Sequence, residues 1–283
     1  MKLIILSGRS GSGKSTALQA LEDAKFHCID NFPVSMLLDL PKNLQEHADI
    51  TNLALCIDAR NSAKSLKKFA QTYNELSQDL DTDLIFLDAD PQTLFKRFST
   101  NRRRHPLTND NTSLSEAIEI EKYILKSFED SAQLKIDTSN LSEQQLRTTI
   151  RDRVINHEQS HLSLQFISFG FKHGAPTDAD FVFDVRCLPN PYWDPDLRKH
   201  TGQHQPVIDF LSEQTEVSEM YVDIFSFIDR WIPKFEQNNR AYLTVAIGCT
   251  GGQHRSVYLA DKLTKGMQTK HVNVQVRHRE LGN

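Results

Sequence analysis

The fold of this chain is decided by Gly8-Arg9-Ser10-Gly11-Ser12-Gly13-Lys14-Ser15, which fills the pattern G-x-x-x-x-G-K-[ST]. The apolar run 3–6 precedes it and predicts a strand, and residues 14–25 follow with apolar side chains at helical spacing. A glycine-rich turn between a strand and a helix N-terminus is typical of a phosphate-binding loop, because backbone N–H groups and the helix dipole favour anions. We therefore expect all eight residues to bind a nucleotide, with Lys14 at the β and γ phosphates and the Ser15 hydroxyl on Mg²⁺.

The rest of the N-terminal half alternates short apolar strands with helices. Strands are expected at 3–6, 27–29, 53–57, 84–87 and 134–136, and helices at 14–25, 34–46, 63–77, 91–99, 114–131 and 143–157. Ser113 with Glu116 and Ser142 with Gln145 predict capping boxes for the last two helices. Strict alternation of this kind indicates a parallel sheet covered on both faces, so the fold class is α/β with an N-terminal P-loop NTPase or kinase-like sheet.

The alternation of strands and helices is interrupted near His157 and then starts again, so a second α/β domain is expected after it. Strands are expected at 162–168, 181–185, 242–248 and 272–276, and helices at 217–235 and 255–264. The predicted organisation is a nucleotide-binding domain over 1–155, a polar linker over 156–161 and a C-terminal domain over 162–283.

Composition indicates a globular protein of the cytoplasm. The chain has 283 residues, 39% of them hydrophobic and 25% charged, and its net charge of −4 argues against polyanion binding by bulk electrostatics. Because the expected strand 3–6 begins almost at once, we expect no signal peptide, and no apolar run approaches the roughly 20 residues of a membrane helix. The four cysteines are far apart, with no C-x-x-C pair.

Acids and arginines at strand ends supply candidate chemistry in the first domain. Asp88 follows the apolar run 84–87 and is expected to hold the metal's water shell, with Asp90 as the alternative. Arg103, within the triplet 102–104, is expected to act as a lid residue that neutralises charge on the γ-phosphoryl group. Lys14, Asp88 and Arg103 are thus the predicted catalytic residues.

The segment Asp58-Ala59-Arg60-Asn61 follows the third expected strand. An Asp and an Asn at the carboxyl end of a strand can hydrogen-bond a base or ribose edge, or they can lie in the N-cap region of the next helix.

A second glycine-rich strand–loop–helix junction runs from Gly248 to Ser256 and matches C-x₅-R-[ST]. It has two interpretations: a phosphate-binding loop, or a cysteine phosphatase in which Cys249 is the nucleophile and Arg255 clamps the phosphate. Gly248 stands where such phosphatases usually carry His, and this favours a loop that binds phosphate without catalysing a reaction. Loops at 168–174, which contains Lys172, and at 188–193 carry groups suited to a sugar phosphate or a nucleotide.

Taken together, these motifs resemble the RapZ/YvcJ family of bacterial P-loop proteins over essentially the whole chain. The resemblance is carried by residues 7–15, 58–61, 86–90, 102–107, 168–174, 188–191 and 248–252. It implies weak ATPase and GTPase activity, ATP or GTP with Mg²⁺ as cofactor, ATP on Gly8–Ser15 and a guanine nucleotide on Asp58–Asn61.

The resemblance also implies regulatory partners. Enteric-type members are RNase adapters that bind small regulatory RNA, present it to ribonuclease E and so tune glucosamine-6-phosphate synthase. Their C-terminal domain resembles part of the phosphofructokinase fold and senses glucosamine-6-phosphate, and the assembly is a homotetramer with no membrane contact. Carried over, the sugar-phosphate site takes Tyr192, Thr250, Gly251 and Arg255, to which the loop patterns add Lys172 and Gly252.

The chain departs from the enteric pattern in two places. Enteric members end in a Lys/Arg-rich tail, whereas here the C-terminal cations expected to bind RNA are Lys270, Arg277 and Arg279. Tyr192 replaces a His, so it can donate to phosphate without carrying a charge. A small-molecule kinase that uses Lys14, Asp88 and the arginine lid remains the main alternative, and the Cys249 phosphatase a lesser one.

Overall fold

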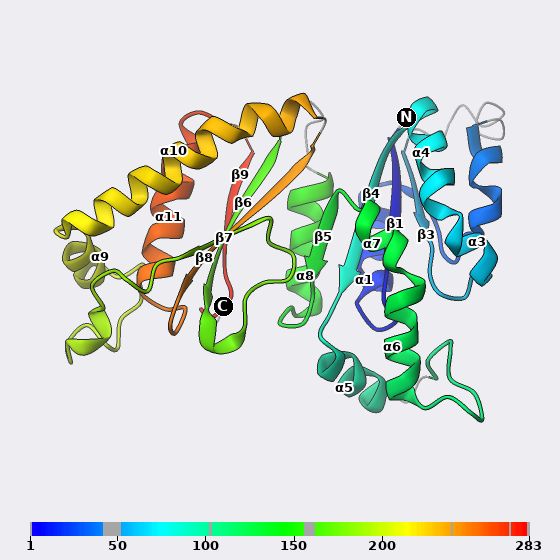
Figure 1. Ribbon diagram of the computed structural model, residues 1–283, viewed down its shortest axis with the longest axis horizontal. Helices are drawn as coiled ribbons and strands as arrows, with labels where there is room; N and C mark the ends of the chain where they lie inside the picture. The colour runs from blue at the N-terminus through cyan, green and yellow to red at the C-terminus, as the bar shows by residue number, and fades with distance from the viewer. Residues whose placement is uncertain are drawn as a thin grey trace. The chain divides into compact units, whose positions relative to one another are not determined.

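The computed structural model describes residues 2–41, 52–101, 104–155, 162–238, 240–271 and 273–281. The chain divides into two compact units, Met1–Asn156 and His157–Asn283, each built around a parallel sheet (Figure 1). Within these ranges no helix has both the length and the apolar character needed to span a bilayer. The predicted linker 156–161 and the predicted lid residue Arg103 lie outside the described residues.

The sheet of the first unit has the order β2-β3-β1-β4-β5, and all its paired strands are parallel. Its strands are β1 (Lys2–Gly8), β2 (His27–Ile29), β3 (Asn52–Cys56), β4 (Asp81–Asp88) and β5 (Leu134–Asp137). All five expected strands are confirmed. Because β1 lies in the middle, the loop that follows it is flanked by the carboxyl ends of β3 and β4.

Helices cover both faces of this sheet, as the alternation of strands and helices predicts. They are α1 (Lys14–Asp23), η1 (Val34–Asp39), α3 (Ala63–Lys67), α4 (Phe69–Asp79), α5 (Pro91–Asn101), α6 (Leu114–Ile124), α7 (Lys126–Ser131), α8 (Glu143–Ile150) and the π-helical turn η2 (Arg151–Ile155). Alternate residues of β1, such as Leu3 and Ile5, join a buried cluster with α4 and α7, while α1 and α8 contact each other on the other face (Figure 1). Both predicted capping boxes are confirmed, at Ser113 and at Ser142.

The structure differs from the sequence expectation where long helices were predicted. The helix expected over 63–77 breaks at Lys68, and the one over 114–131 breaks at Leu125. Each break turns the following aromatic side chain into the core, where the rings of Phe69 and Phe128 stack with centroids 3.5 Å apart. Burial of these rings therefore overrides helical periodicity. Of the helix expected over 34–46, residues 34–39 form the 3₁₀ helix η1, and residues 42–46 lie outside the described part.

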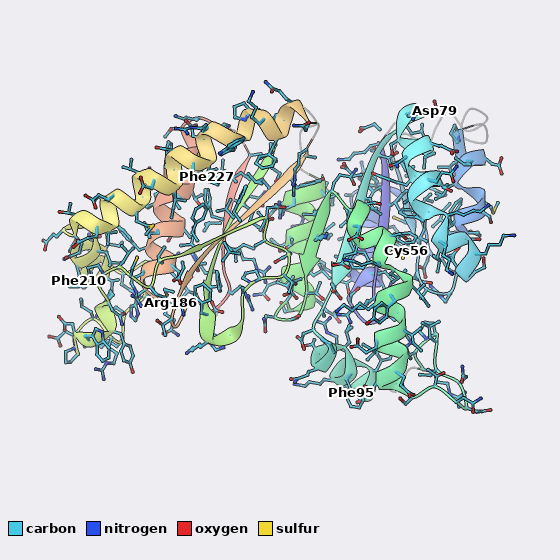
Figure 2. All side chains as sticks on the ribbon, in the orientation of Figure 1. Cys56, Asp79, Phe95, Arg186, Phe210 and Phe227 are labelled. Atoms are coloured by element: carbon cyan, nitrogen blue, oxygen red, sulfur yellow. The ribbon has the colours of Figure 1, made fainter. Side chains whose placement is uncertain are left out.

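The second unit has a four-stranded sheet of order β7-β8-β6-β9. Its strands are β6 (Ser163–Gly170), β7 (Phe181–Asp184), β8 (Tyr242–Cys249) and β9 (Val274–His278), and its helices are η3 (Phe171–His173), η4 (Pro191–Trp193), α9 (Gln205–Ser212), α10 (Thr215–Gln237) and α11 (Arg255–Gln268). Every residue of the two central strands, β6 and β8, is buried. On edge strand β7, Phe181 and Phe183 pack edge-on against Phe227 of α10. Figure 2 labels Phe227 on that helix.

Candidate functional site

The glycine-rich turn leaves β1 between two neighbouring strands and enters α1 through Gly13, which occupies the N-cap position. Gly8 has φ +146°, and a Cβ at this position would collide with the backbone of Leu87 on β4. The N–H of Arg9 then donates to the Leu87 carbonyl at 3.2 Å. The turn is thus pressed against β4 so closely that only glycine fits at its start.

Lys14 folds back over the turn that it follows. Its Nζ donates to the carbonyl oxygens of Gly8 at 2.8 Å and Arg9 at 3.0 Å. Ser15, the predicted metal ligand, lies exposed in the first turn of α1. A lysine and a hydroxyl at a helix N-terminus give a turn that can receive a polyphosphate.

One side of the turn is held by Glu121 of α6, a residue that the sequence did not lead us to expect at the site. This fully buried carboxylate of α6 accepts hydrogen bonds from the backbone N–H of Ser10 at 2.9 Å and from its hydroxyl at 2.7 Å. Burial would raise the pKa of Glu121, but the bond to His105, the charge of Lys14 and the Ser10 hydroxyl together lower it. Glu121 lies on the apolar stripe of its helix with Ala117, Ile118 and Leu125, and an acid in such a stripe is a signal that the sequence does carry.

His105 completes this contact. The Leu107 N–H donates to His105 Nδ1 at 3.2 Å, so the ring proton sits on Nε2 and points to Glu121, 3.1 Å away. Both side chains are buried. The segment after α5 is therefore tied to the turn through one carboxylate.

The opposite side of the turn is held by residues from α5 and from the end of β5. Arg97 donates to the carbonyl oxygens of Gly11, at 2.9 Å, and of Thr138, at 2.6 Å. The Thr138 hydroxyl lies 3.0 Å from the carbonyl oxygens of both Ser12 and Asp88. Arg97, which stands next to the predicted arginine lid, thus braces the turn.

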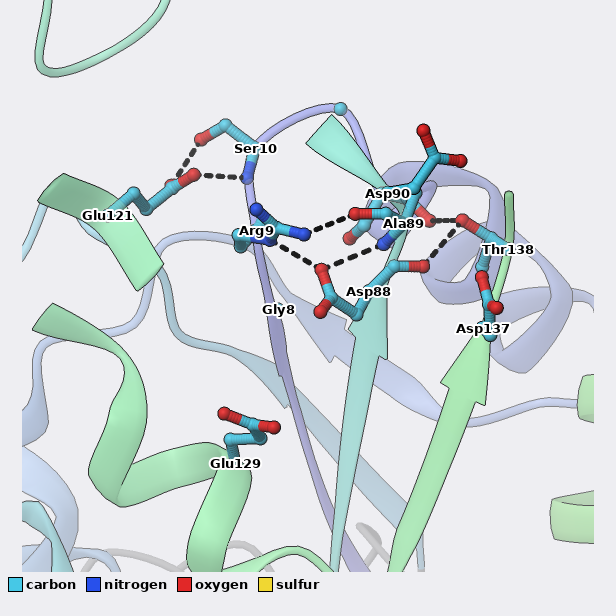
Figure 3. A network of polar contacts seen from close by, with 12 residues as sticks. Gly8, Arg9, Ser10, Asp88, Ala89, Asp90, Glu121, Glu129, Asp137 and Thr138 are labelled. Atoms are coloured by element: carbon cyan, nitrogen blue, oxygen red, sulfur yellow. Dashed lines mark hydrogen bonds and ion pairs between the residues drawn. The ribbon is translucent and has the colours of Figure 1, made fainter. Parts of the chain in front are cut away.

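Asp88, the predicted metal acid, is paired with an arginine of the turn itself (Figure 3). Arg9 Nε donates to Asp88 Oδ1, and the Arg9 guanidinium also donates to the Ala89 carbonyl. Arg9 is only 4% exposed. Burial raises the pKa of Asp88, and the Arg9 guanidinium opposes that rise.

The segment Asp58–Asn61 forms the turn between β3 and α3, at the same edge of the sheet. Asp58 is buried and accepts from the backbone N–H of Arg60 at 2.9 Å and from its guanidinium. Burial would raise the pKa of Asp58, but the Arg60 bonds and the charge of Lys14 outweigh it and lower the pKa. Asn61 accepts from Val34 N at 2.9 Å and donates to the Phe32 carbonyl, so its amide holds the loop that follows β2.

The second glycine-rich junction lies at the carboxyl edge of the second sheet, with Cys249 at the end of β8. Cys249 is buried, and its Sγ lies 3.2 Å from the Gly252 N–H and 3.1 Å from the Ser256 hydroxyl. Arg255 donates to the carbonyl oxygens of Arg186 at 2.8 Å and of Leu188 at 2.9 Å. Through these contacts, Arg255 anchors the loop after β7. The Nε of Arg255 is buried and has no hydrogen-bond partner among the described residues.

The loops after β6 and β8 meet at this edge, and Glu280 reaches between them. The N–H of Lys172 donates to the Thr250 carbonyl at 3.3 Å, and the Gly170 N–H donates to Glu280 Oε2 at 3.1 Å. Gly252 has φ +75°, and a Cβ there would collide with the Glu280 carboxylate. Burial raises the pKa of Glu280, although the Gly170 N–H and the charges of Arg279, His173 and Lys172 oppose it.

The remaining predicted residues have definite places in the second unit. Tyr192 lies on η4 and is 48% exposed, with the guanidinium of Arg198 over its ring. Lys270 forms an ion pair with Asp229 at 2.7 Å. Arg279 donates to the Gly174 carbonyl at 3.1 Å. Arg277 lies on β9, opposite Ile167 of β6. Lys270 and Arg279 are thus engaged with other residues of the protein.

The P-loop turn, its lysine and the parallel sheet behind it define a P-loop nucleotide-binding protein. The chain matches the RapZ-like N-terminal domain over residues 1–158 and the RapZ C-terminal domain over residues 162–282, and it belongs to the RapZ family. It is 52% identical to a nucleotide-binding protein of Ectopseudomonas mendocina and 53% identical to one of Azotobacter vinelandii. Both alignments span 284 residues, 99% of this chain and 100% of the relative.

Two solved structures show weaker similarity over about half of the chain. A sugar kinase from a Janibacter species gives a TM-score of 0.37 at 16% identity, covering 53% of this chain and 92% of the kinase. A shikimate kinase from Bacteroides thetaiotaomicron gives 0.36 at 19% identity, covering 53% and 94%. Within the described residues, no cluster of three or more His, Cys, Asp or Glu side chains is arranged to hold a metal ion.

The contact between Glu121 and the turn predicts a pH-dependent loss of stability in Glu121→Gln. Because its folded pKa is lowered, ionised Glu121 adds stability above the unfolded value of about 4.3, and this contribution is lost as the pH falls through the folded pKa. At pH 7 the variant should be less stable by about 1–3 kcal/mol in urea unfolding, with the gap narrowing below about pH 4. Glu119→Gln, an exposed change on the same helix, is the control; a gap that does not vary with pH would contradict the assignment.

Proposed function

We propose that this protein binds ATP or GTP with Mg²⁺ at the Gly8–Ser15 turn and hydrolyses it slowly, as a regulator and not as a small-molecule kinase. The observation that carries the proposal is the turn itself, which Glu121 holds on one side and Arg97 and Thr138 hold on the other. The relatives' printed name, nucleotide-binding protein, supports the binding step. Arg97 is bonded to the Thr138 carbonyl and Asp88 is paired with Arg9. Because these contacts hold both side chains in place around the turn, they favour slow hydrolysis over a kinase reaction.

A bound Mg²⁺ would supply positive charge that neutralises the phosphate oxygens. The Ser15 hydroxyl and an acid at a neighbouring strand end are the residues that fit this ion, since oxygen ligands suit magnesium. Lys14 would exchange its two carbonyl partners for phosphate oxygens and so hold the polyphosphate in place.

For the second unit we propose a sensor of hexosamine phosphate, with glucosamine-6-phosphate as the ligand. Thr250 and Gly251 leave the end of β8 at the N-terminus of the 14-residue helix α11, where backbone N–H groups favour an anion. A Cβ at Gly251 would meet nothing within 4 Å, so the backbone is open at this point. Lys172 and Tyr192 lie on the neighbouring loops as further donors, and family membership supports the proposal.

We further propose the RNase-adapter role, in which a homotetramer binds small regulatory RNA and presents it to ribonuclease E in the cytoplasm. Its support is family membership together with the contacts of Arg279. The N–H of Arg279 donates to the Ser168 carbonyl at 3.0 Å and its guanidinium to the Gly174 carbonyl, so the basic C-terminal segment touches the sugar-phosphate loops. A ligand in those loops could therefore change how the cations are presented to RNA.

Nucleotide binding is tested with Lys14→Ala. Loss of the ammonium should weaken ATP binding at least about tenfold in isothermal titration calorimetry, because a charge-assisted hydrogen bond to phosphate is lost. Lys64→Ala, an exposed change on α3, should leave the affinity unchanged. Unaltered ATP affinity in Lys14→Ala, with the melting temperature of the wild type, would refute the P-loop assignment.

The second site is tested with Glu280→Gln. Because Glu280 places a carboxylate against the Gly170 N–H, removing its charge should raise the affinity for glucosamine-6-phosphate about fivefold, equivalent to about 1 kcal/mol of relieved repulsion. Titration with glucose-6-phosphate should show the same gain. A loss of affinity confined to the amino sugar would contradict this expectation and would pair Glu280 with the ligand's ammonium group.

RNA binding is tested by charge reversal at Lys270, Arg277 and Arg279. The triple variant should bind a structured small RNA more weakly, and each lost phosphate contact should reduce the slope of log affinity against log salt by about 0.7–0.9. Because Lys270 is paired with Asp229, the fold of the variant must be checked by circular dichroism. Reversal of the exposed Lys126 is the control, and an unchanged gel shift for the triple variant would refute the prediction.

A further inference from the structure

The loop after β7 leaves two neighbouring aromatic side chains in solvent. Trp193 is 77% exposed and Tyr192 is 48% exposed, and both belong to η4, with their ring centroids 6.1 Å apart. The backbone beneath them is fixed, because Pro191 is buried and the Asn190 side chain accepts from the Tyr192 N–H at 3.4 Å. Packing within the second unit does not account for the position of these rings, and large aromatic side chains are enriched where proteins meet a partner.

An arginine lies beside these rings. The Arg198 guanidinium is 4.6 Å from the centroid of the Tyr192 ring, and its Nε donates to the Tyr192 carbonyl at 3.1 Å. Leu188 and Leu197 of the same loop are buried, so the exposed rings are bordered by a guanidinium group and not by these leucines. Tyr192, Trp193 and Arg198 together form a surface that we call the η4 surface.

The loop that carries the η4 surface is joined to the basic C-terminal segment through the loop after β6. Arg186, which Figure 2 labels, comes from the same loop as η4 and places its guanidinium 4.2 Å from the centroid of the Phe171 ring. Arg279 donates to the carbonyl of Gly174, three residues further along the loop of Phe171. All four strands of this parallel sheet end at the same edge, so the η4 loop and the C-terminal cations share it.

The η4 surface suits a flat partner better than a charged one. Arg198 and Lys199 are offset by the exposed Asp194 and Asp196 of the same stretch, so η4 and the residues after it add no net charge that would attract phosphates over a distance. Aromatic rings and guanidinium planes stack on nucleic acid bases, and bases offer their faces only where a strand is unpaired. Bases on the η4 surface and phosphates on the C-terminal cations can therefore belong to one RNA.

We propose that the η4 surface binds unpaired RNA bases by stacking, with Trp193 as the ring on which a base stacks. This inference rests on the proposed binding of RNA and goes beyond it, because the C-terminal cations read only the phosphates. It gives the protein a preference for RNA with an unpaired loop over a continuous duplex.

The first measurement uses Trp193 as its own reporter. The chain has two tryptophans, Trp193 and Trp231, so Trp231→Phe leaves the fluorescence of Trp193 alone. Titration of this variant with a short RNA hairpin that has an unpaired loop should quench the fluorescence, because a stacked base covers the indole. A fully paired RNA duplex of the same length should leave the fluorescence unchanged.

The second measurement compares affinities in gel shifts. Trp193→Ala should weaken binding of the hairpin about tenfold, the usual effect of removing one base–aromatic stack, and should leave the duplex affinity unchanged. The slope of log affinity against log salt should stay at the wild-type value, because no phosphate contact is removed. Trp193→Phe, which keeps a ring, should retain most of the affinity, and Trp231→Ala on α10 is the matched control.

The outcomes separate this inference from the proposed function. Full hairpin affinity in Trp193→Ala, or an equal loss for hairpin and duplex, would overturn the stacking role and leave the η4 surface to a protein partner or to phosphate contacts. A loss of glucosamine-6-phosphate binding in Trp193→Ala, with RNA binding intact, would overturn it in favour of a sugar contact. Failure of the wild type to bind either RNA would refute the proposed adapter role and the inference with it.

Discussion

A phosphate-binding turn made mostly of glycine and serine cannot hold its own shape. The first unit therefore depends on contacts from neighbouring elements that fix this turn. Such a turn has few side chains to pack, and its backbone N–H groups must stay free for an anion. The structure solves this from outside: Glu121 holds one side through Ser10, Arg97 and Thr138 hold the other through carbonyl oxygens, and Arg9 ties its base to β4. Most of these side-chain contacts are made to carbonyl oxygens, and the side-chain contact to a backbone N–H of the turn is the one from Ser10 to Glu121.

The second unit places a similar junction at the end of its own parallel sheet but holds it differently. Here Arg255, the first residue of α11, donates to two carbonyl oxygens of the loop after β7. The Glu280 carboxylate stands against the Gly170 N–H, where a ligand anion would compete with it. A site that carries its own carboxylate would bind anions weakly, and weak binding would suit the sensor role proposed for this unit.

The strands and the two capping boxes could be predicted from the sequence because they depend on neighbours a few residues apart. Apolar runs bounded by turns mark buried parallel strands, and a Ser followed three residues later by Glu or Gln marks a cap. The helix breaks at Lys68 and Leu125 could not be predicted, because they serve a stacking contact between Phe69 and Phe128 that forms only in the folded core. The ion pair between Arg9 and Asp88 also joins residues that are far apart in the sequence. No local sequence pattern tells whether an acid at a strand end is paired with an arginine.

The contact of His105 with Glu121 links the residues around 105–107 to the phosphate-binding turn. His105 follows the triplet 102–104, its Nε2 proton points to Glu121, and the same carboxylate holds Ser10 in the turn. Without the His105 contact, Glu121 would lose a donor that helps to keep it ionised in the interior. The hydrogen bonds that hold Ser10 in the turn therefore depend on His105 through one buried carboxylate.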